Sequence, residues 1–264
     1  MSSFQSILER AQPADYEFLI AALKSPVNFS SDASLHRHYE AFQRDPCAAH
    51  RAALARQIER EIRYLGSADL AYFFRWLTRR EPGVPLDDLL DAIAQRLGVK
   101  LKPIGTPRSR LECLVRAVVE QAVLDLSEDQ QRALFRDRDL GPAVEDELLR
   151  HLKSKGRVAL LVRMLGQDVV EKLVPGLVLS TITPFLGREA AGQLMTRLAA
   201  RFPLWAEWLG PVLWGVTAAW LTIDLQSPAF RKTTPAILYC GLISLRDGPE
   251  EGLAFWQATD DDEA

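Results

Sequence analysis

The chain has 264 residues, of which 32 are Lys or Arg and 35 are Asp or Glu, so its formal net charge is −3. Because there is no basic excess, nucleic acid is not expected as the main partner. The three cysteines, Cys47, Cys113 and Cys240, are far apart and odd in number, which argues for free thiols in a reducing compartment. The first residues contain charge and no apolar core of signal-peptide length, so we expect the protein in the cytoplasm.

The first 156 residues read as consecutive amphipathic helices, without the alternation of a strand. Helices are predicted over 13–25, 33–44 (started by Ser31 or Asp32), 47–65, 67–80, 85–98 and from 106 onward. Gly66 is expected to end its helix as a left-handed residue. Glu112, Arg116 and Glu120 are expected to form an i,i+4 ladder on an outer face. The positions expected to face the core are Phe18, Leu19, Ala22, Leu23, Leu54, Ile58, Ile62, Leu65, Leu70, Phe73, Phe74, Leu77, Leu86, Leu89, Leu90, Ile93, Ala94, Leu97, Leu111, Leu114, Val115, Val118 and Ala122.

Charge density falls about twofold after residue 156. Residues 157–245 hold 13 charged residues in 89, whereas the other 175 residues hold 54. We therefore divide the chain into an N-terminal helical segment (1–60), an amphipathic helical domain (61–156), an apolar helical region (157–247) and an acidic tail (248–264). Within the apolar region, Pro175 and Pro184 are expected to interrupt the uncharged run 173–186.

The least polar stretch runs from Trp205 to Leu245 and contains two uncharged runs, 208–223 and 233–245. Neither run reaches the roughly 18 to 20 apolar residues of a membrane-spanning helix. Between them, Pro228 and Pro235 are expected to forbid one continuous helix, which predicts a helical hairpin. A buried core hairpin and a hairpin that enters or lies on a bilayer both fit, because Trp favours membrane interfaces. The tryptophans expected to contact a membrane or a partner are Trp205, Trp208, Trp214 and Trp220.

Signatures of catalysis and of metal binding are absent from the sequence. It contains neither a phosphate-binding glycine motif nor a nucleophile elbow. His36, His38, Cys47 and His50 match no structural zinc spacing, and the two histidines of the H-x-H pair fall on different faces of a helix. We read Glu147 and His151 as a surface pair. No catalytic residue, cofactor or metal is therefore predicted, and the protein is not expected to be an enzyme.

Four stretches together resemble one bacterial family. They are EIRYLGSADLAYFFRW, PLDDLLDAIAQRLGVKL, VLDLSEDQ and LGPVLWGVTAAWLTIDLQSPAFRKTTPAILYCGLISLR, within Ile62 to Arg246 approximately. Their order is similar to that of the YaaW-type family, whose central part is described as a ubiquinol-cytochrome c chaperone-like domain. The chain departs from that family at Phe230, where Tyr is expected, and at Lys232 to Pro235. The resemblance places in one motif Gly210, Pro211, Gly215, Asp224, Pro228, Arg231 and Pro235.

The resemblance implies a helical module that acts on another protein or a membrane complex. The fold expected is all-α: a multi-helix globular bundle with an apolar C-terminal helical hairpin, in which Asp224 and Arg231 could pair across the turn. The function expected is that of a non-enzymatic adaptor or chaperone-like protein acting at or near a membrane. The alternative is an effector or toxin that converts from a soluble to a membrane-inserted state. The expected partner is a protein or a membrane surface, and the protein itself is expected in the cytoplasm, either peripheral to or inserting at the inner membrane.

Overall fold

The computed structural model describes residues 3–24, 29–66, 83–101, 105–124, 166–186 and 228–257, together with Ala159 and Val162. Every regular element among these residues is a helix, which confirms the predicted all-α class. The helices are α1 (Ser3–Glu9), α2 (Pro13–Leu23), α3 (Phe29–Arg44), α4 (Ala48–Leu65), α6 (Leu86–Arg96), α7 (Pro107–Leu124), α11 (Gln167–Ile182), the 3-10 helix η1 (Thr183–Phe185), α14 (Pro228–Leu245) and α15 (Leu253–Gln257).

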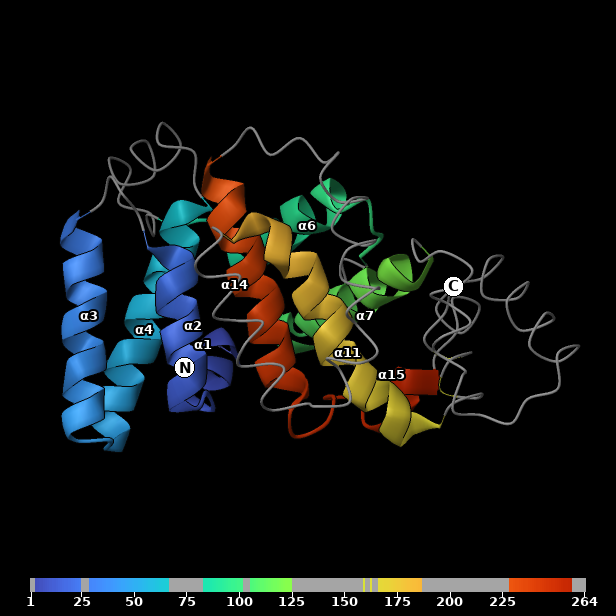
Figure 1. Ribbon diagram of the computed structural model, residues 1–264, viewed down its shortest axis with the longest axis horizontal. Helices are drawn as coiled ribbons and strands as arrows, with labels where there is room; N and C mark the ends of the chain where they lie inside the picture. The colour runs from blue at the N-terminus through green and yellow to red at the C-terminus, as the bar shows by residue number, and fades with distance from the viewer. Residues whose placement is uncertain are drawn as a thin grey trace, which may run out of the picture.

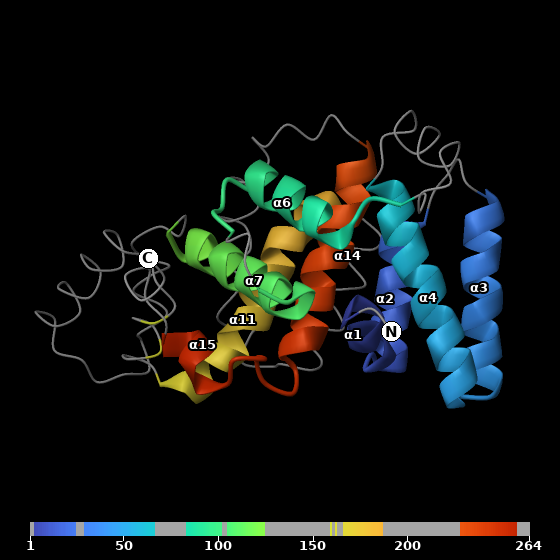
Figure 2. The ribbon, with the colours of Figure 1, turned by 180° about the vertical axis from the view of Figure 1, so that it is seen from behind.

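Helix α14 lies in the middle of an elongated molecule (Figures 1 and 2). It packs against α1, α2 and α4 on one side and against α7 and α11 on the other, while α3 lies along α4 at one end. Buried side chains from all these helices form one hydrophobic core. Helices from residues 1–60, 61–156 and 157–247 thus share a core that α14 completes.

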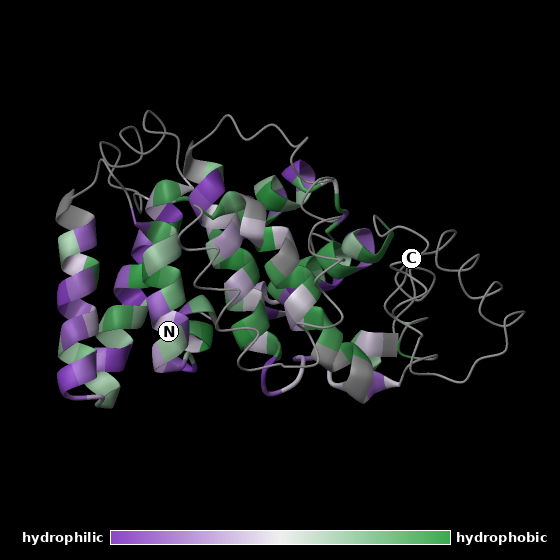
Figure 3. Cartoon of the chain, viewed as in Figure 1, coloured by the Kyte–Doolittle hydropathy of each residue, from purple (hydrophilic) through white to green (hydrophobic). Residues whose placement is uncertain are grey.

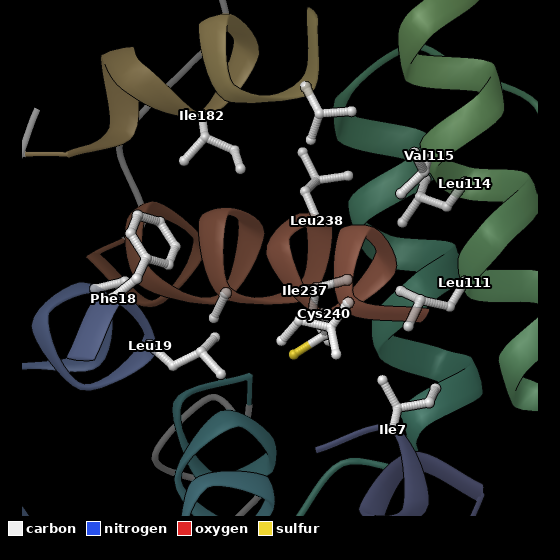
Figure 4. Close-up of a cluster of buried hydrophobic side chains, with 14 of the residues drawn as sticks. Ile7, Phe18, Leu19, Leu111, Leu114, Val115, Ile182, Ile237, Leu238 and Cys240 are labelled. Carbon is white, nitrogen blue, oxygen red and sulfur yellow. The ribbon is translucent and has the colours of Figure 1, made fainter. Parts of the chain in front are cut away.

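The core-facing positions follow the apolar periodicity of the sequence. Among the predicted core positions that the structure describes, Leu65 and Leu86 are only partly buried, and the others are buried. Around α14, side chains such as Leu19, Leu111 and Ile182 converge on Ile237 and Leu238 (Figure 4). Each such side chain stabilises the fold by roughly 1.5 to 3 kcal/mol when fully buried. Hydrophilic residues are instead prominent on α3 at the edge of the molecule (Figure 3).

One predicted helix start and the predicted conformation of Gly66 were wrong, whereas the predicted end of α4 at Leu65 is confirmed. Helix α3 begins at Phe29, so Ser31 and Asp32 lie inside its first turns and do not precede it. Gly66 ends α4 in a right-handed conformation with φ −70°, so a left-handed terminus is not why glycine stands there. A Cβ at Gly66 would lie 2.8 Å from Leu89 Cδ1 on α6, which is closer than real carbon contacts. An alanine at this position would therefore require the end of the Leu89 side chain to move.

The prolines were also misjudged, because two of them lie inside helices. Pro175 is within α11 and Pro235 is within α14, although both were expected to interrupt a helix. A proline inside a helix removes one backbone hydrogen bond and can kink the helix. In α14 the lost bond is the one to the carbonyl of Arg231, whose side chain is exposed to solvent, while Ala236, Ile237 and Leu238 beyond the proline are fully buried. Burial of this apolar segment offsets the cost of the proline.

Close contact between α14 and α7 depends on Gly241. A Cβ built on Gly241 would lie 2.3 Å from Val115 Cγ2 and 3.5 Å from the Leu111 carbonyl oxygen. Only glycine therefore allows the two helices to pack at this distance. Gly241 was not singled out from the sequence, because the close approach involves a residue 126 positions earlier (241 − 115).

Candidate functional site

The sequence-predicted motif falls only partly on the described residues. Pro228, Arg231 and Pro235 lie on α14, whose bounds are Pro228–Leu245. This helix contains the second uncharged run of the predicted hairpin. The other predicted site residues lie outside the described residues; they are Trp205, Trp208, Gly210, Pro211, Trp214, Gly215, Trp220 and Asp224. The first arm of the hairpin and the expected pair of Asp224 with Arg231 therefore also lie outside the described part of the chain.

The N-terminal end of α14 brings cationic and aromatic side chains together. We call Arg96, Phe230, Arg231 and Lys232 the cationic end of α14. The Arg96 guanidinium lies over the Phe230 ring, 4.1 Å from its centroid. Such a cation–π contact orients the arginine while leaving its N–H groups able to bind an acceptor. Arg96 and Arg231 are both exposed to solvent.

Lys232 differs from these two arginines because it is partly buried. Burial lowers the pKa of Lys232, while the charges of Asp32 on α3 and Glu61 on α4 act in the opposite direction. The Lys232 ammonium group therefore interacts electrostatically with carboxylates of α3 and α4. The exposed positive charge of the cationic end consequently comes from Arg96 and Arg231.

At the C-terminal end of α14, a buried carboxylate ties the helix to α2. The Asp15 side chain is buried and receives two bonds of 2.7 Å from the Arg246 guanidinium, one at each carboxylate oxygen. It also accepts from the Tyr239 hydroxyl at 3.0 Å and from the Gln12 backbone N–H at 2.6 Å. The Tyr239 ring in turn stacks on Phe18, with centroids 4.0 Å apart. Charge-assisted, bidentate bonds of this kind fix orientation as well as adding stability.

A second buried carboxylate ties the same end to α7. Glu112 is 0% exposed, accepts from Arg108 Nε at 2.8 Å and from the backbone N–H of Glu250 at 2.8 Å, and also accepts from the Ser244 hydroxyl. Arg108 further donates to the Gly248 carbonyl at 2.9 Å. The residues that follow α14 are thereby clamped to the first turns of α7.

The predicted outer ladder of α7 is therefore wrong for Glu112, which lies inside. Arg116 is only partly exposed and donates to the Phe255 carbonyl oxygen at 2.9 Å. The i,i+4 spacing indicates that two side chains share a face, but it does not indicate which face is buried. Here α14 and the segment after it cover the face that the sequence pattern left to solvent.

Four polar residues of this arrangement were missed by the sequence reasoning. They are Asp15, Arg108, Glu112 and Ser244, and their partners lie up to 231 positions apart in the chain. For Asp15, a local signal was available, because it stands three residues after Gln12 in the first turn of α2. Both carboxylates are paired with arginine, and these bonds hold α2 and α7 to the end of α14.

None of the helices in the described part of the chain combines the length and the apolar character that a membrane span needs. Helix α14 has 18 residues, but its first turns carry Arg231 and Lys232.

Comparison with known proteins gives one distant likeness. No protein-family model matches this chain, and no solved structure matches it. A UPF0174 protein of Helicobacter pylori strain J99 is 21% identical over 202 residues, which cover 74% of this chain and 72% of that protein. The name of that protein states no activity.

Proposed function

We propose that this protein is a non-enzymatic helical adaptor, of the chaperone-like kind implied by the YaaW-type resemblance, that acts at or near a membrane. The observation that carries the proposal is the asymmetry of α14. Its C-terminal end is fixed by two buried carboxylates. Its N-terminal end exposes Arg231, lies beside the exposed Arg96 of α6 and directly follows the Trp-rich sequence 205–227. In this proposal α14 anchors the segment 205–227 to the folded protein, and that segment contacts the membrane.

The chemistry of that end fits an anionic lipid surface. Trp side chains favour the interface between water and lipid, and basic residues near an anionic bilayer each contribute about 1 kcal/mol of binding. Arg96 and Arg231 supply the charge, and the tryptophans of the preceding segment supply the apolar rings. The protein would then sit on the cytoplasmic side of the membrane, with α14 still in its core.

The alternative, insertion of the whole hairpin, requires α14 to leave the core. It would remove Ile237, Leu238 and Ile243 from contact with the other helices and would break the bonds of Arg246 and Ser244 to two buried carboxylates. Leaving such a carboxylate without its arginine is strongly destabilising. A peripheral contact through the entering segment avoids this cost, so we favour it.

The first test is flotation of the full chain with vesicles, recording Trp fluorescence in the same samples. We expect flotation and a blue shift with vesicles containing phosphatidylglycerol, and neither with pure phosphatidylcholine. Arg231→Glu should weaken binding at least about fivefold, since one basic residue contributes about 1 kcal/mol. Arg37→Glu makes the same charge change at an exposed position of α3 and should leave binding unchanged. Absence of flotation would contradict action at a lipid surface and leave a protein partner.

Cys240 distinguishes the peripheral contact from insertion. This thiol is fully buried on α14, and burial raises its pKa above the usual range, with the nearby charge of Asp15 adding to the shift. In a Cys47→Ser, Cys113→Ser variant, maleimide present throughout vesicle binding should leave Cys240 unmodified, and urea should expose it. Labelling on vesicle addition, together with leakage that disappears on Trp214→Glu or Gly215→Glu, would support insertion instead.

A further inference from the structure

A mixed group of metal-ligating side chains lies at the corner between α3 and α4. Asp45, Cys47 and His50 each offer one ligand atom, and these atoms all lie within 4.8 Å of one another. Asp45 and Cys47 belong to the three-residue connection, and His50 lies in the first turn of α4. His36 and His38, which lie earlier on α3, are not part of this group.

The local structure already holds the imidazole beside the carboxylate. His50 Nδ1 lies 2.9 Å from the backbone carbonyl oxygen of Asp45 and 3.5 Å from its Oδ2 atom. Pro46 fixes one backbone dihedral between the other two ligands. The backbone N–H of Cys47 bonds to the Asp45 carbonyl at 2.8 Å, which closes the turn. The arrangement therefore belongs to a short, defined corner and not to a long loop.

The neighbouring cations do not neutralise this carboxylate. Arg44 pairs with Glu40 at 3.0 Å. Arg51 lies over the Phe42 ring and donates to the Glu9 carbonyl oxygen at 3.2 Å. Both arginines are thus engaged on other faces, and the thiol, imidazole and carboxylate are partly or fully open to solvent.

We propose that Asp45, Cys47 and His50 bind a divalent transition-metal ion of the zinc type. Zinc accepts sulfur, nitrogen and oxygen ligands in one tetrahedral site, whereas Mg²⁺ and Ca²⁺ select oxygen alone. Zinc–ligand bond lengths place neighbouring ligand atoms roughly 3.3 to 3.8 Å apart. The present spread requires a closure of about 1 Å, which rotation of solvent-accessible side chains supplies. Cys47 would bind as the thiolate, releasing its proton to solvent, and water would take the fourth position.

Such an ion would tie the connection to α4 and so hold α3 against it. The proposed metal site is independent of the membrane function proposed above, because the corner lies at the opposite ends of α3 and α4 from the cationic end of α14. The group matches no structural zinc pattern because the D-x-C-x-x-H spacing is short and one of its three ligands is an aspartate.

The test is titration of the reduced full chain with Co²⁺, a spectroscopic substitute for Zn²⁺. We expect one ion per chain and a thiolate-to-cobalt charge-transfer band that Zn²⁺ displaces. Cys47→Ser should abolish the band, and His50→Ala and Asp45→Asn should each weaken binding at least about tenfold, since loss of even an outer partner costs about that much. Cys113→Ser and His36→Ala should bind as the unmodified chain does.

Cys47→Ser is informative because it should not unfold the corner. Cys47 occupies the N-cap of α4 without a side-chain capping bond, and serine is a preferred N-cap residue. Without metal, the thermal unfolding midpoint of the Cys47→Ser variant should therefore equal or exceed that of the unmodified chain. Zinc should raise the midpoint of the unmodified chain and not that of the variant. Absence of the band, or a band and a zinc shift that persist in Cys47→Ser, would overturn the proposal.

Discussion

The two ends of α14 are held by different kinds of interaction. At the C-terminal end, Asp15 and Glu112 are buried and each is bonded to an arginine and to further donors. At the N-terminal end, Arg96 and Arg231 are exposed, and the contact of Arg96 is with an aromatic ring. Removing a partner from a buried pair leaves a charge without solvent, whereas changing an exposed charge leaves water in its place.

Because of this difference in burial, the two ends of α14 should contribute to different properties, one to the stability of the fold and the other to vesicle binding. Substitutions at the C-terminal end should act on the free energy of unfolding, and substitutions at the N-terminal end should act on vesicle binding. Unfolding free energy and vesicle binding, measured on the same variants, therefore test this separation.

Glu112→Ala should have the largest effect, lowering the free energy of unfolding by about 3 kcal/mol, because Arg108 and Ser244 lose their buried acceptor. Urea unfolding followed by circular dichroism measures it. Glu112→Gln preserves volume and acceptor oxygen and should cost less. Glu40→Ala, in an exposed pair with Arg44, should cost below about 0.5 kcal/mol and serves as the control. Equal losses for Glu112→Ala and Glu40→Ala would contradict the structural role of Glu112.

Gly241→Ala should lower the free energy of unfolding by about 1 to 3 kcal/mol, because the added Cβ meets Val115 Cγ2 on α7. Val115→Ala removes that atom and by itself leaves a cavity. The double variant should lose less unfolding free energy than the sum of the two single losses, because the Cβ added by Gly241→Ala would occupy the space that Val115→Ala vacates. A strictly additive cycle would show that the two helices do not meet at this point.

Alkaline pH should weaken the packing around Tyr16 of α2, whose ring contacts Phe42. Burial, the largest cause, raises the pKa of Tyr16 from its ordinary value of 10.0 to about 12. Because the folded-state pKa is the higher one, its stabilisation is complete below pH 10 and is lost as the pH rises toward 12. The loss should reach about 1 kcal/mol by pH 11.

Tyr16→Phe isolates this titration from that of other groups. The variant loses the 2.7 Å bond from the Tyr16 hydroxyl to the Leu8 carbonyl oxygen at every pH, whereas that oxygen keeps its bond from the Ala11 N–H. The difference in unfolding free energy between the unmodified chain and the variant should therefore shrink between pH 9 and pH 11. A difference that stays constant over this interval would show that Tyr16 titrates near its ordinary pKa.

Arg231→Glu should have the smallest effect on stability, within about 0.5 kcal/mol, because the side chain is exposed. The same variant should show the loss of vesicle binding described above. Urea unfolding and flotation on one preparation give both values. A large loss of stability would place Arg231 among the anchors and abolish the distinction between the two ends.

The helical part of this fold was predictable because burial follows a local period. The stripe Leu111, Leu114, Val115 and Val118 needs only the 3.6-residue repeat to be recognised, and all four are buried. Pro235 was misread because local propensity predicts a break, whereas tertiary packing of the following turns outweighs it. Propensity is a weak guide where an apolar helix has a core to enter.

The polar anchors and the metal-ligating corner could not be predicted in the same way. Glu112 and Ser244 are 132 positions apart, and nothing near either residue indicates the other. Asp45 joins Cys47 and His50 only because the short connection turns its carboxylate toward them. Such groups are defined by the meeting of distant or sharply turned segments, which a one-dimensional pattern does not contain.

The long separation between Asp15 and Arg246 also bears on synthesis of the chain. Their bond joins residues 231 positions apart, and α14 with its neighbours supplies the middle of the core. At roughly 5 to 20 residues per second, the ribosome needs about 10 to 50 s to make the intervening segment. During that time α2, and later also α7, have apolar faces without their partner α14, so the nascent chain should depend on protection from aggregation until its last helices emerge.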